Sequence, residues 1–316
     1  MKKPLIVIAG PTASGKTDTS ILLSKKIDGE IISADSMQVY KYMDIGTAKP
    51  TKEEMQNVPH YLIDELYPDE EFNVMIFQKK AKQYIEEIYK KNKIPIIAGG
   101  TGFYINALIN DIDFISTVSD ESYRKQLYDF AQTHGANALH KKLQEIDSAS
   151  ADNIHENNIK RVARALEFYH LTGKKFSEYN EEEKKKQSPY NVAFIVLNME
   201  REKLYKRINL RVDKMIEQGL VEEVKSLLEK GYLPNLVSMQ GLGYKEIIPY
   251  IEGKTTLDQA VEQLKQSTRH FAKRQLTWFR RQTDGLWLDL TNNSKECIIN
   301  YICDYLAKLN IWNEEQ

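Results

Sequence analysis

A short apolar run at residues 5–9 leads directly into the octapeptide Gly10-Pro11-Thr12-Ala13-Ser14-Gly15-Lys16-Thr17. Glycines at this spacing let backbone N–H groups turn inward around an anion, and the helical pattern that follows offers its N-terminus to negative charge. Lys16 supplies a mobile cation for terminal phosphates, and the Thr17 hydroxyl is placed to hold Mg²⁺. The octapeptide therefore predicts a P-loop that binds a diphosphate or a triphosphate.

The regions around the octapeptide predict an α/β fold. Further apolar runs, each continuous rather than alternating, occupy residues 30–34, 94–98, 192–197 and 286–290. Continuous apolar strands are typical of a parallel sheet covered by helices on both faces. The clearest helical pattern is 74–90, with Asn73 placed to cap it. The expected architecture is a P-loop NTPase-like parallel sheet core.

The spacing of these runs predicts a helical insertion domain. About ninety residues separate the third and fourth runs, roughly three times a simple strand–helix–strand unit. The patterns between them are helical, at 122–133, 136–147 and 158–171, and 174–187 is expected to be a solvated connector rich in Glu and Lys. We expect a catalytic core of 1–112 and 191–316 and an insertion domain of 113–190.

The composition predicts a cytoplasmic monomer. The chain has 316 residues, a net charge of −1 and no apolar run long enough for a membrane span or a secretory leader. The two cysteines, Cys297 and Cys303, do not share a helical face and are expected to be reduced. A net charge close to zero leaves RNA binding to local basic faces.

The residues that follow the strands argue against nucleotide hydrolysis. An NTPase normally has an acid at the end of an apolar strand, to organise Mg²⁺ and water. Here the run 94–98 ends in Gly99-Gly100-Thr101-Gly102, and the one acid in a comparable place is Asp35. Asp35 is either a functional carboxylate or a helix cap.

At this point the chain resembles a known family. The shared blocks, in order, are residues 10–17, 35–40, 46–50, 59–64, 99–102, 161–167, 243–246 and 273–280. They resemble the bacterial tRNA dimethylallyltransferases, also called isopentenylpyrophosphate transferases. Residues 113–122 lack the proline-rich sequence that this family shows there.

The resemblance implies a reaction. A dimethylallyl group passes from its diphosphate to the exocyclic amine of the adenosine immediately 3′ of the anticodon, in tRNAs that read codons beginning with uridine. Asp35 is then the base, and the departing diphosphate is stabilised by Lys16, Thr101, Arg211 and Mg²⁺ on Thr17. Arg211 shares a helix face with Arg207 in 202–218, and both are alternatively solvated surface residues.

The resemblance also implies where the tRNA anticodon stem-loop binds. Gln38 is expected to contact the adenine edge, within a loop of tRNA-binding residues that also includes Asp35, Ser36 and Met37. Two basic helices complete the expected set, with Lys160, Arg161, Val162, Ala163 and Arg164 in one and Lys273 and Arg274 in the other. Both basic faces are alternatively plain solvated surface. Three aromatic residues alternate with the basic residues of the second helix: Phe271, Trp278 and Phe279. They are alternatively part of the hydrophobic core, and this is expected of Phe271 in particular.

Three other functions fit parts of the sequence. An enzyme that prenylates free adenylate shares the P-loop and Asp35 but needs neither basic helix. A small-molecule kinase would share the P-loop but would have an acidic residue at the position of Gly99–Gly102. An RNA-binding protein switched by nucleotide would form no covalent product.

Overall fold

The core of the structure is one parallel sheet. The computed structural model describes residues 2–114 and 120–313. The strands are β1 (Lys3–Ala9), β2 (Gly29–Ser33), β3 (His60–Tyr61), β4 (Ile94–Gly99), β5 (Tyr190–Asn198) and β6 (Leu286–Asp289). They are paired in the order β3-β2-β4-β1-β5-β6, and every pairing is parallel. The five predicted strands and the α/β class are confirmed, whereas β3 was not predicted.

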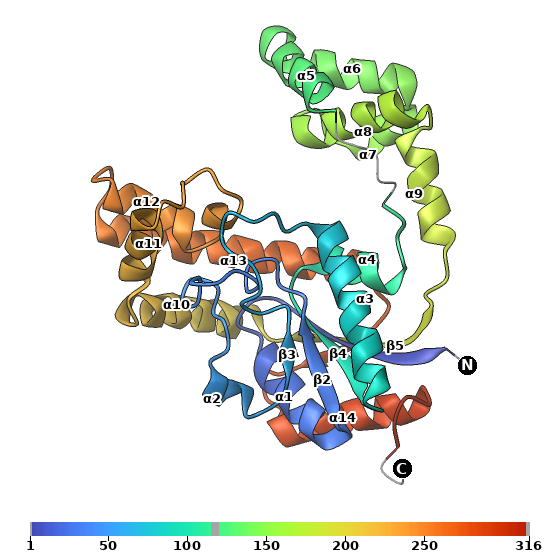
Figure 1. The fold of residues 1–316 in the computed structure, drawn as a ribbon, viewed down its shortest axis with the longest axis vertical. Coiled ribbons are helices and arrows are strands. Elements are labelled where there is room, and N and C mark those ends of the chain that lie inside the picture. Colours follow the sequence, from blue (N-terminus) through green and yellow to red (C-terminus); the bar gives the residue numbers. More distant parts are fainter. Residues whose placement is uncertain (1, 115–119, 314–316) are drawn as a thin grey trace. The chain divides into compact units, whose positions relative to one another are not determined.

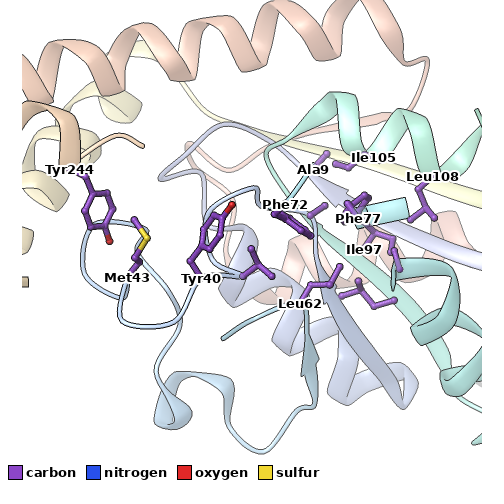
Figure 2. Close-up of a cluster of buried hydrophobic side chains, with 14 of the residues drawn as sticks. Ala9, Tyr40, Met43, Leu62, Phe72, Phe77, Ile97, Ile105, Leu108 and Tyr244 are labelled. Carbon is purple, nitrogen blue, oxygen red and sulfur yellow. The ribbon is translucent and has the colours of Figure 1, made fainter. Parts of the chain in front are cut away.

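Helices cover both faces of this sheet. On one face α1 (Lys16–Ile27) and α14 (Lys295–Lys308) pack against alternate strand residues such as Ile6, Ile8 and Ile96. On the other, α3 (Val74–Lys90), α4 (Gly102–Ile109) and α13 (Leu257–Gln282) contribute to the larger apolar cluster. Figure 2 shows Phe77 and Leu108 from two of these helices beside Ile97 of β4. Burial on both faces explains why the strand runs are continuous rather than alternating.

Helix α3 begins and ends where its sequence pattern predicts. It spans Val74–Lys90, and the Asn73 side chain accepts hydrogen bonds from the N–H groups of Met75 and Ile76. Its buried residues are Phe77, Ala81, Ile85 and Ile88. The predicted helix and its cap are therefore confirmed.

A helical layer follows β5 in the sequence. It consists of α10 (Arg201–Glu217), α11 (Leu220–Glu229), α12 (Tyr244–Ile251) and α13, while the short α2 (Lys52–Met55) lies between β2 and β3. Helices α10 and α13 run antiparallel, because Arg269 bonds to Asn209 at 2.7 Å and Lys265 pairs with Asp213 at 2.7 Å. The two helices lie beside each other in Figure 1, and residues of both line the site described below.

The chain divides into two compact units. The first unit holds the sheet and comprises Met1–Ile109 and Ser188–Gln316. The second unit is Asn110–Gln187, whereas the sequence predicted an insertion at 113–190. The second contains α5 (Glu121–His134), α6 (Ala136–Ile146), α7 (Ser148–Asn153), α8 (Ile159–Thr172) and α9 (Phe176–Lys185), around an apolar core of its own.

The segment expected to be a connector is largely helical. Helix α9 covers most of residues 174–187 and has no buried residue. The sequence thus indicated its exposure correctly, but runs of Glu and Lys are also good helix formers. Across the described residues, none of the helices has the length and apolarity that a bilayer crossing requires.

Candidate active site

Three loops meet at the carboxyl ends of neighbouring strands. Ala9 of β1 is in register with Gly99 of β4, and Ala34, directly after β2, donates its N–H to Ala98 at 2.8 Å. The P-loop, the Gly99–Gly102 turn and Asp35 therefore lie side by side, with the turn in the middle. In an open parallel sheet this edge is where ligands bind.

Close backbone packing explains two of the glycines in these loops. A Cβ on Gly99 would lie 2.2 Å from the carbonyl oxygen of Ala34, and one on Gly10 would lie 2.5 Å from that of Leu197. The Thr101 N–H also donates to Ala34 O at 3.2 Å. These contacts fix Asp35 beside Thr101.

The three loops line one cavity of about 400 Å³. The predicted site residues on its wall are Thr12, Ala13, Ser14, Gly15, Lys16, Thr17, Asp35, Ser36, Met37, Gln38, Thr101, Arg211 and Arg274. Gly10, Pro11 and Lys273 are not part of the wall. All the lining residues belong to the first unit.

Two cations face the P-loop from different elements. Lys16 begins α1 and donates from Nζ to the Pro11 carbonyl at 2.7 Å, and Arg211 of α10 donates to the Thr12 hydroxyl at 3.4 Å. Burial and the Arg211 charge lower the pKa of Lys16 to about 7, although the Asp35 carboxylate opposes the shift. An anion bound between the two cations would relieve this repulsion.

Asp35 is both a local cap and a partly unpaired carboxylate. Its Oδ1 accepts from the N–H groups of Met37 at 2.9 Å and Gln38 at 3.4 Å. Within residues 2–114 and 120–313, Oδ2 accepts no hydrogen bond. Burial raises the pKa of Asp35, while these backbone bonds and Lys16 hold it down. No described helix begins at Asp35, so its Oδ1 holds a turn rather than a helix N-terminus, while Oδ2 stays available to a ligand.

The loop beside Gln38 is held by residues that the sequence analysis did not select. Glu223 of α11 accepts the N–H groups of Asp44, Ile45 and Gly46 at 2.8–3.0 Å, and the Tyr244 hydroxyl donates to it at 2.7 Å. A Cβ on Gly46 would lie 2.6 Å from the Tyr244 ring, which explains the glycine of the 46–50 block.

Gln275 was also missed. Its Oε1 accepts the Thr12 N–H at 2.9 Å, and its Nε2 donates to the Gly100 carbonyl at 2.9 Å. One buried amide thus joins α13 to the P-loop and to the turn after β4. A glutamine on the buried stripe of α13, between Thr268 and Phe279, was the available signal, since buried polar groups require partners.

Apolar side chains also line the cavity. Val212 and Met215 of α10 and Leu264 of α13 are among them. The Thr268 hydroxyl, which also lines the cavity, donates to Leu264 O of its own helix at 2.7 Å. Apolar lining of this kind suits a hydrocarbon group.

The aromatic residues of α13 do not form one exposed stacking surface. Phe279 is fully buried, and Trp278 packs against Gly102. Phe271, expected in the core, instead lines the cavity, with the Arg274 guanidinium 5.7 Å from its ring centroid. Lys273 and Arg274 are exposed.

In the second unit the basic face of α8 is smaller than expected. Lys160 and Arg161 are exposed, but Arg164 bonds to buried Glu167 at 2.9 Å. Val162 and Ala163 are 0% exposed and belong to the unit's core. The expectation of direct tRNA contact by these two side chains is therefore wrong, because the apolar stripe of α8 faces inward.

The side chains near the P-loop could hold Mg²⁺ only together with the oxygens of a bound phosphate ligand. Among the described residues no group of three acids, histidines or cysteines could hold a metal, and Asp18 at the cavity edge pairs with Lys295 at 2.6 Å. The Thr17 side chain forms no hydrogen bond with any described residue. A lone hydroxyl beside a phosphate cradle suits Mg²⁺, which takes few protein ligands and completes its shell with phosphate oxygens and water.

Comparisons with known proteins cover most of the chain. A family model described as IPP transferase matches residues 38–282. The tRNA dimethylallyltransferases of Lachnoclostridium phytofermentans and Acetivibrio thermocellus are 56% and 52% identical to this protein. Each alignment covers 98% of this chain and 99% of the relative.

Solved structures are similar as well. The tRNA isopentenylpyrophosphate transferase of Bacillus halodurans is 45% identical, with a TM-score of 0.74 and 98% of both chains covered. A eukaryotic dimethylallyltransferase acting on tRNA is 32% identical, with a TM-score of 0.83 over 99% of this chain and 81% of that one.

Proposed function

The chain belongs to the IPP transferase family and prenylates tRNA, and from this premise we propose its donor, its acceptor and its catalytic groups. The donor is dimethylallyl diphosphate. The acceptor is the exocyclic amine of the adenosine immediately 3′ of the anticodon, in tRNAs that read codons beginning with uridine. The observation that supports this most is that the Asp35 carboxylate, the Lys16–Arg211 pair and apolar residues of α10 and α13 line one cavity.

The cradle stabilises the leaving group. As the allylic C–O bond breaks, negative charge grows on the diphosphate while the dimethylallyl cation is stabilised by resonance. Lys16, Arg211, the P-loop amides and the Thr101 hydroxyl donate toward that charge. One well-placed donor of this kind contributes about 3 kcal/mol to the barrier reduction. No water needs activation, which agrees with glycines rather than an acid after β4.

Asp35 accepts the proton from the amine. The adenine amine is a poor nucleophile because its lone pair is delocalised into the ring, and it must lose one proton as the new N–C bond forms, since the nitrogen would otherwise carry a positive charge. Asp35 Oδ2 is the acceptor, because Oδ1 is held by two backbone N–H groups. The products are isopentenyladenosine and diphosphate, with the proton on Asp35 until solvent takes it.

Mg²⁺ would bind to Thr17 together with the diphosphate, and when bound it neutralises part of the leaving group's charge. The tRNA would contact Lys273 and Arg274 of α13 and, from the second unit, Lys160 and Arg161 of α8. We further propose that the protein is a cytoplasmic monomer.

The test uses labelled dimethylallyl diphosphate, Mg²⁺ and an anticodon stem-loop. A matched loop with guanosine at the target position is the control, and free AMP is a parallel acceptor. Label in the adenosine loop alone supports the proposal. Label in AMP would show that the protein is an adenylate prenyltransferase. Label in neither acceptor would show that the proposed donor or the proposed acceptor is wrong.

A further inference from the structure

The block at residues 59–64 contains a histidine that the proposed function leaves without a role. His60 lies on β3 at the edge of the sheet, is partly buried and lines the cavity. It is in register with Ile31 of β2, and Ser33, two residues further along that strand, also lines the cavity. The side chains at these three positions therefore project from the same face of the sheet.

That face is the one that α1 covers. Ile31 packs in the apolar cluster that includes Ile21 of α1. Helix α1 begins directly after the P-loop, and Thr17 and Ser20 in its first turns line the cavity. His60 is thus on the side of the sheet where the proposed function places Mg²⁺, beside Thr17.

One hydrogen bond fixes which ring nitrogen of His60 carries the hydrogen. Nδ1 lies 2.8 Å from the Val58 carbonyl oxygen, which can only accept, so Nδ1 is the nitrogen with the hydrogen. Burial lowers the pKa of His60, although the bond to Val58 opposes this shift, so the ring is neutral at pH 7. Nε2 is then an acceptor, and it has no hydrogen-bond partner within residues 2–114 and 120–313.

An acceptor at this place on the wall requires a ligand that donates. The ionised diphosphate offers only acceptor oxygens, the dimethylallyl group has no polar hydrogen, and the adenine amine is assigned to Asp35. Water on Mg²⁺ does donate, and this ion keeps several waters where protein ligands are few. A P-loop NTPase holds the ion and its water with an acid after a strand, whereas this chain has glycines after β4. Asp18, the acid nearest to Thr17 in the sequence, is paired with Lys295 at 2.6 Å.

We propose that His60 is a positioning residue for the metal, its Nε2 accepting a hydrogen bond from the water shell of the Mg²⁺ that Thr17 and the diphosphate hold. The inference rests on the proposed donor and metal, and adds a protein group on the water side of the ion. A neutral ring orients the water and leaves the full charge of the ion to the diphosphate, which an acid at this place would not do. Loss of such a partner lowers metal affinity about tenfold to hundredfold.

The test measures how much Mg²⁺ strengthens the binding of inorganic diphosphate, with no tRNA and no prenyl donor present. Diphosphate affinity is determined by equilibrium dialysis in excess Mg²⁺ and again in EDTA, and the ratio of the two affinities is the metal gain. His60→Asn keeps an N–H at the position of Nδ1, for the Val58 carbonyl, and loses the acceptor at the position of Nε2. We expect its metal gain to fall about tenfold to hundredfold, with the affinity in EDTA unchanged.

His60→Gln is the matched variant. Its longer side chain places an amide oxygen near the position of Nε2, so most of the metal gain should return although the bond to Val58 is lost. His270→Asn, at an exposed position on α13, is the control and should keep the full gain. A purely structural role of His60 predicts the opposite order, with the Asn variant closer to the unaltered protein than the Gln variant.

Three results would overturn the proposal. The first is a full metal gain in His60→Asn, and the second is an equal loss in the Asn and Gln variants. The third is an unaltered protein that binds diphosphate equally well in Mg²⁺ and in EDTA. Transfer of label to the adenosine loop by the unaltered protein tests the proposed function separately.

Discussion

The side-chain oxygen of Gln275 accepts the backbone N–H of Thr12 at 2.9 Å, although the two residues lie on α13 and in the P-loop. The other end of the same amide donates to Gly100, so one buried side chain sets the distance between the phosphate cradle and the turn that holds Thr101. The helix with the basic residues Lys273 and Arg274 is thereby joined to the site of bond breaking.

Gln275→Glu keeps the size of the side chain and removes one of its two hydrogen bonds, so it should test the hydrogen bonds separately from packing. A carboxylate still accepts the Thr12 N–H but leaves the Gly100 carbonyl without its donor, which costs about 1–3 kcal/mol of unfolding free energy. Denaturant unfolding measures this loss, and the KM for the donor should rise with it. Gln266→Glu, exposed on the same helix, is the control. Equal stability of the two variants would contradict the bridge.

Asp35→Asn should keep the fold and donor binding and lose turnover. The Asn oxygen can still cap Met37 and Gln38, but the amide cannot take the amine proton. We expect a loss of about 100-fold or more in single-turnover rate. Asp304→Asn, exposed on α14, is the control. A near-normal rate in Asp35→Asn would remove Asp35 as the base.

The lowered pKa of Lys16 predicts that donor binding takes up a proton. With a pKa of about 7, most free enzyme has neutral Lys16 at pH 8, whereas the bound diphosphate favours the charged form. Uptake should therefore approach one proton at pH 8, and affinity should fall about tenfold per pH unit above 7. Calorimetry in two buffers of different ionisation enthalpy measures the uptake without tRNA present.

Lys16→Arg is the control for that titration. Arginine stays protonated throughout this range, so proton uptake should vanish and the affinity should become flat between pH 7 and pH 9. The donor's own phosphates are already ionised at pH 8, since their last pKa is about 6. Equal uptake by both proteins would place the titrating group elsewhere.

Glu223→Gln should loosen the loop beside Gln38. Asp44 and Ile45 donate to one carboxylate oxygen and Gly46 to the other, so the amide nitrogen would face one or two of these N–H groups and lose their hydrogen bonds. A charge-assisted bond of this kind contributes about 1.5–3 kcal/mol. Unfolding free energy and transfer rate should both fall. Glu222→Gln, the exposed neighbour on α11, should change neither. Faster hydrogen exchange at Ile45 and Gly46 would locate the change in the loop.

Much of this fold was predictable because its signals are local. Buried parallel strands require continuous apolar runs, and the P-loop requires its glycines and Lys16 in one octapeptide. β3 was not predictable, since His60 and Tyr61 are too few to show a period. Glu223 and Gln275 were missed because each acts on a loop more than 170 residues away in the chain.

The error at Val162 and Ala163 has a different origin. At the helical spacing both residues share a face of α8 with Leu166, and the structure buries all three. The family resemblance was extended to every residue of that segment, although only the exposed face of a helix can contact RNA. When the helical period places a side chain in the core and the family resemblance implies that it contacts RNA, its burial in the structure shows which interpretation is correct.

The exposed cations on α8 and α13 lead to the last prediction. If Lys273 and Arg274 contact tRNA phosphates, binding weakens steeply with salt, because each contact releases condensed counterions. Lys273→Ala should reduce the slope of log affinity against log salt by about one, whatever the target base. Lys160→Ala should do the same from the second unit, and Lys308→Ala on α14 should not. Filter binding at several salt concentrations distinguishes these outcomes. A slope unchanged in all three variants would show that neither helix binds the tRNA backbone, and would leave the cavity loops as the RNA site.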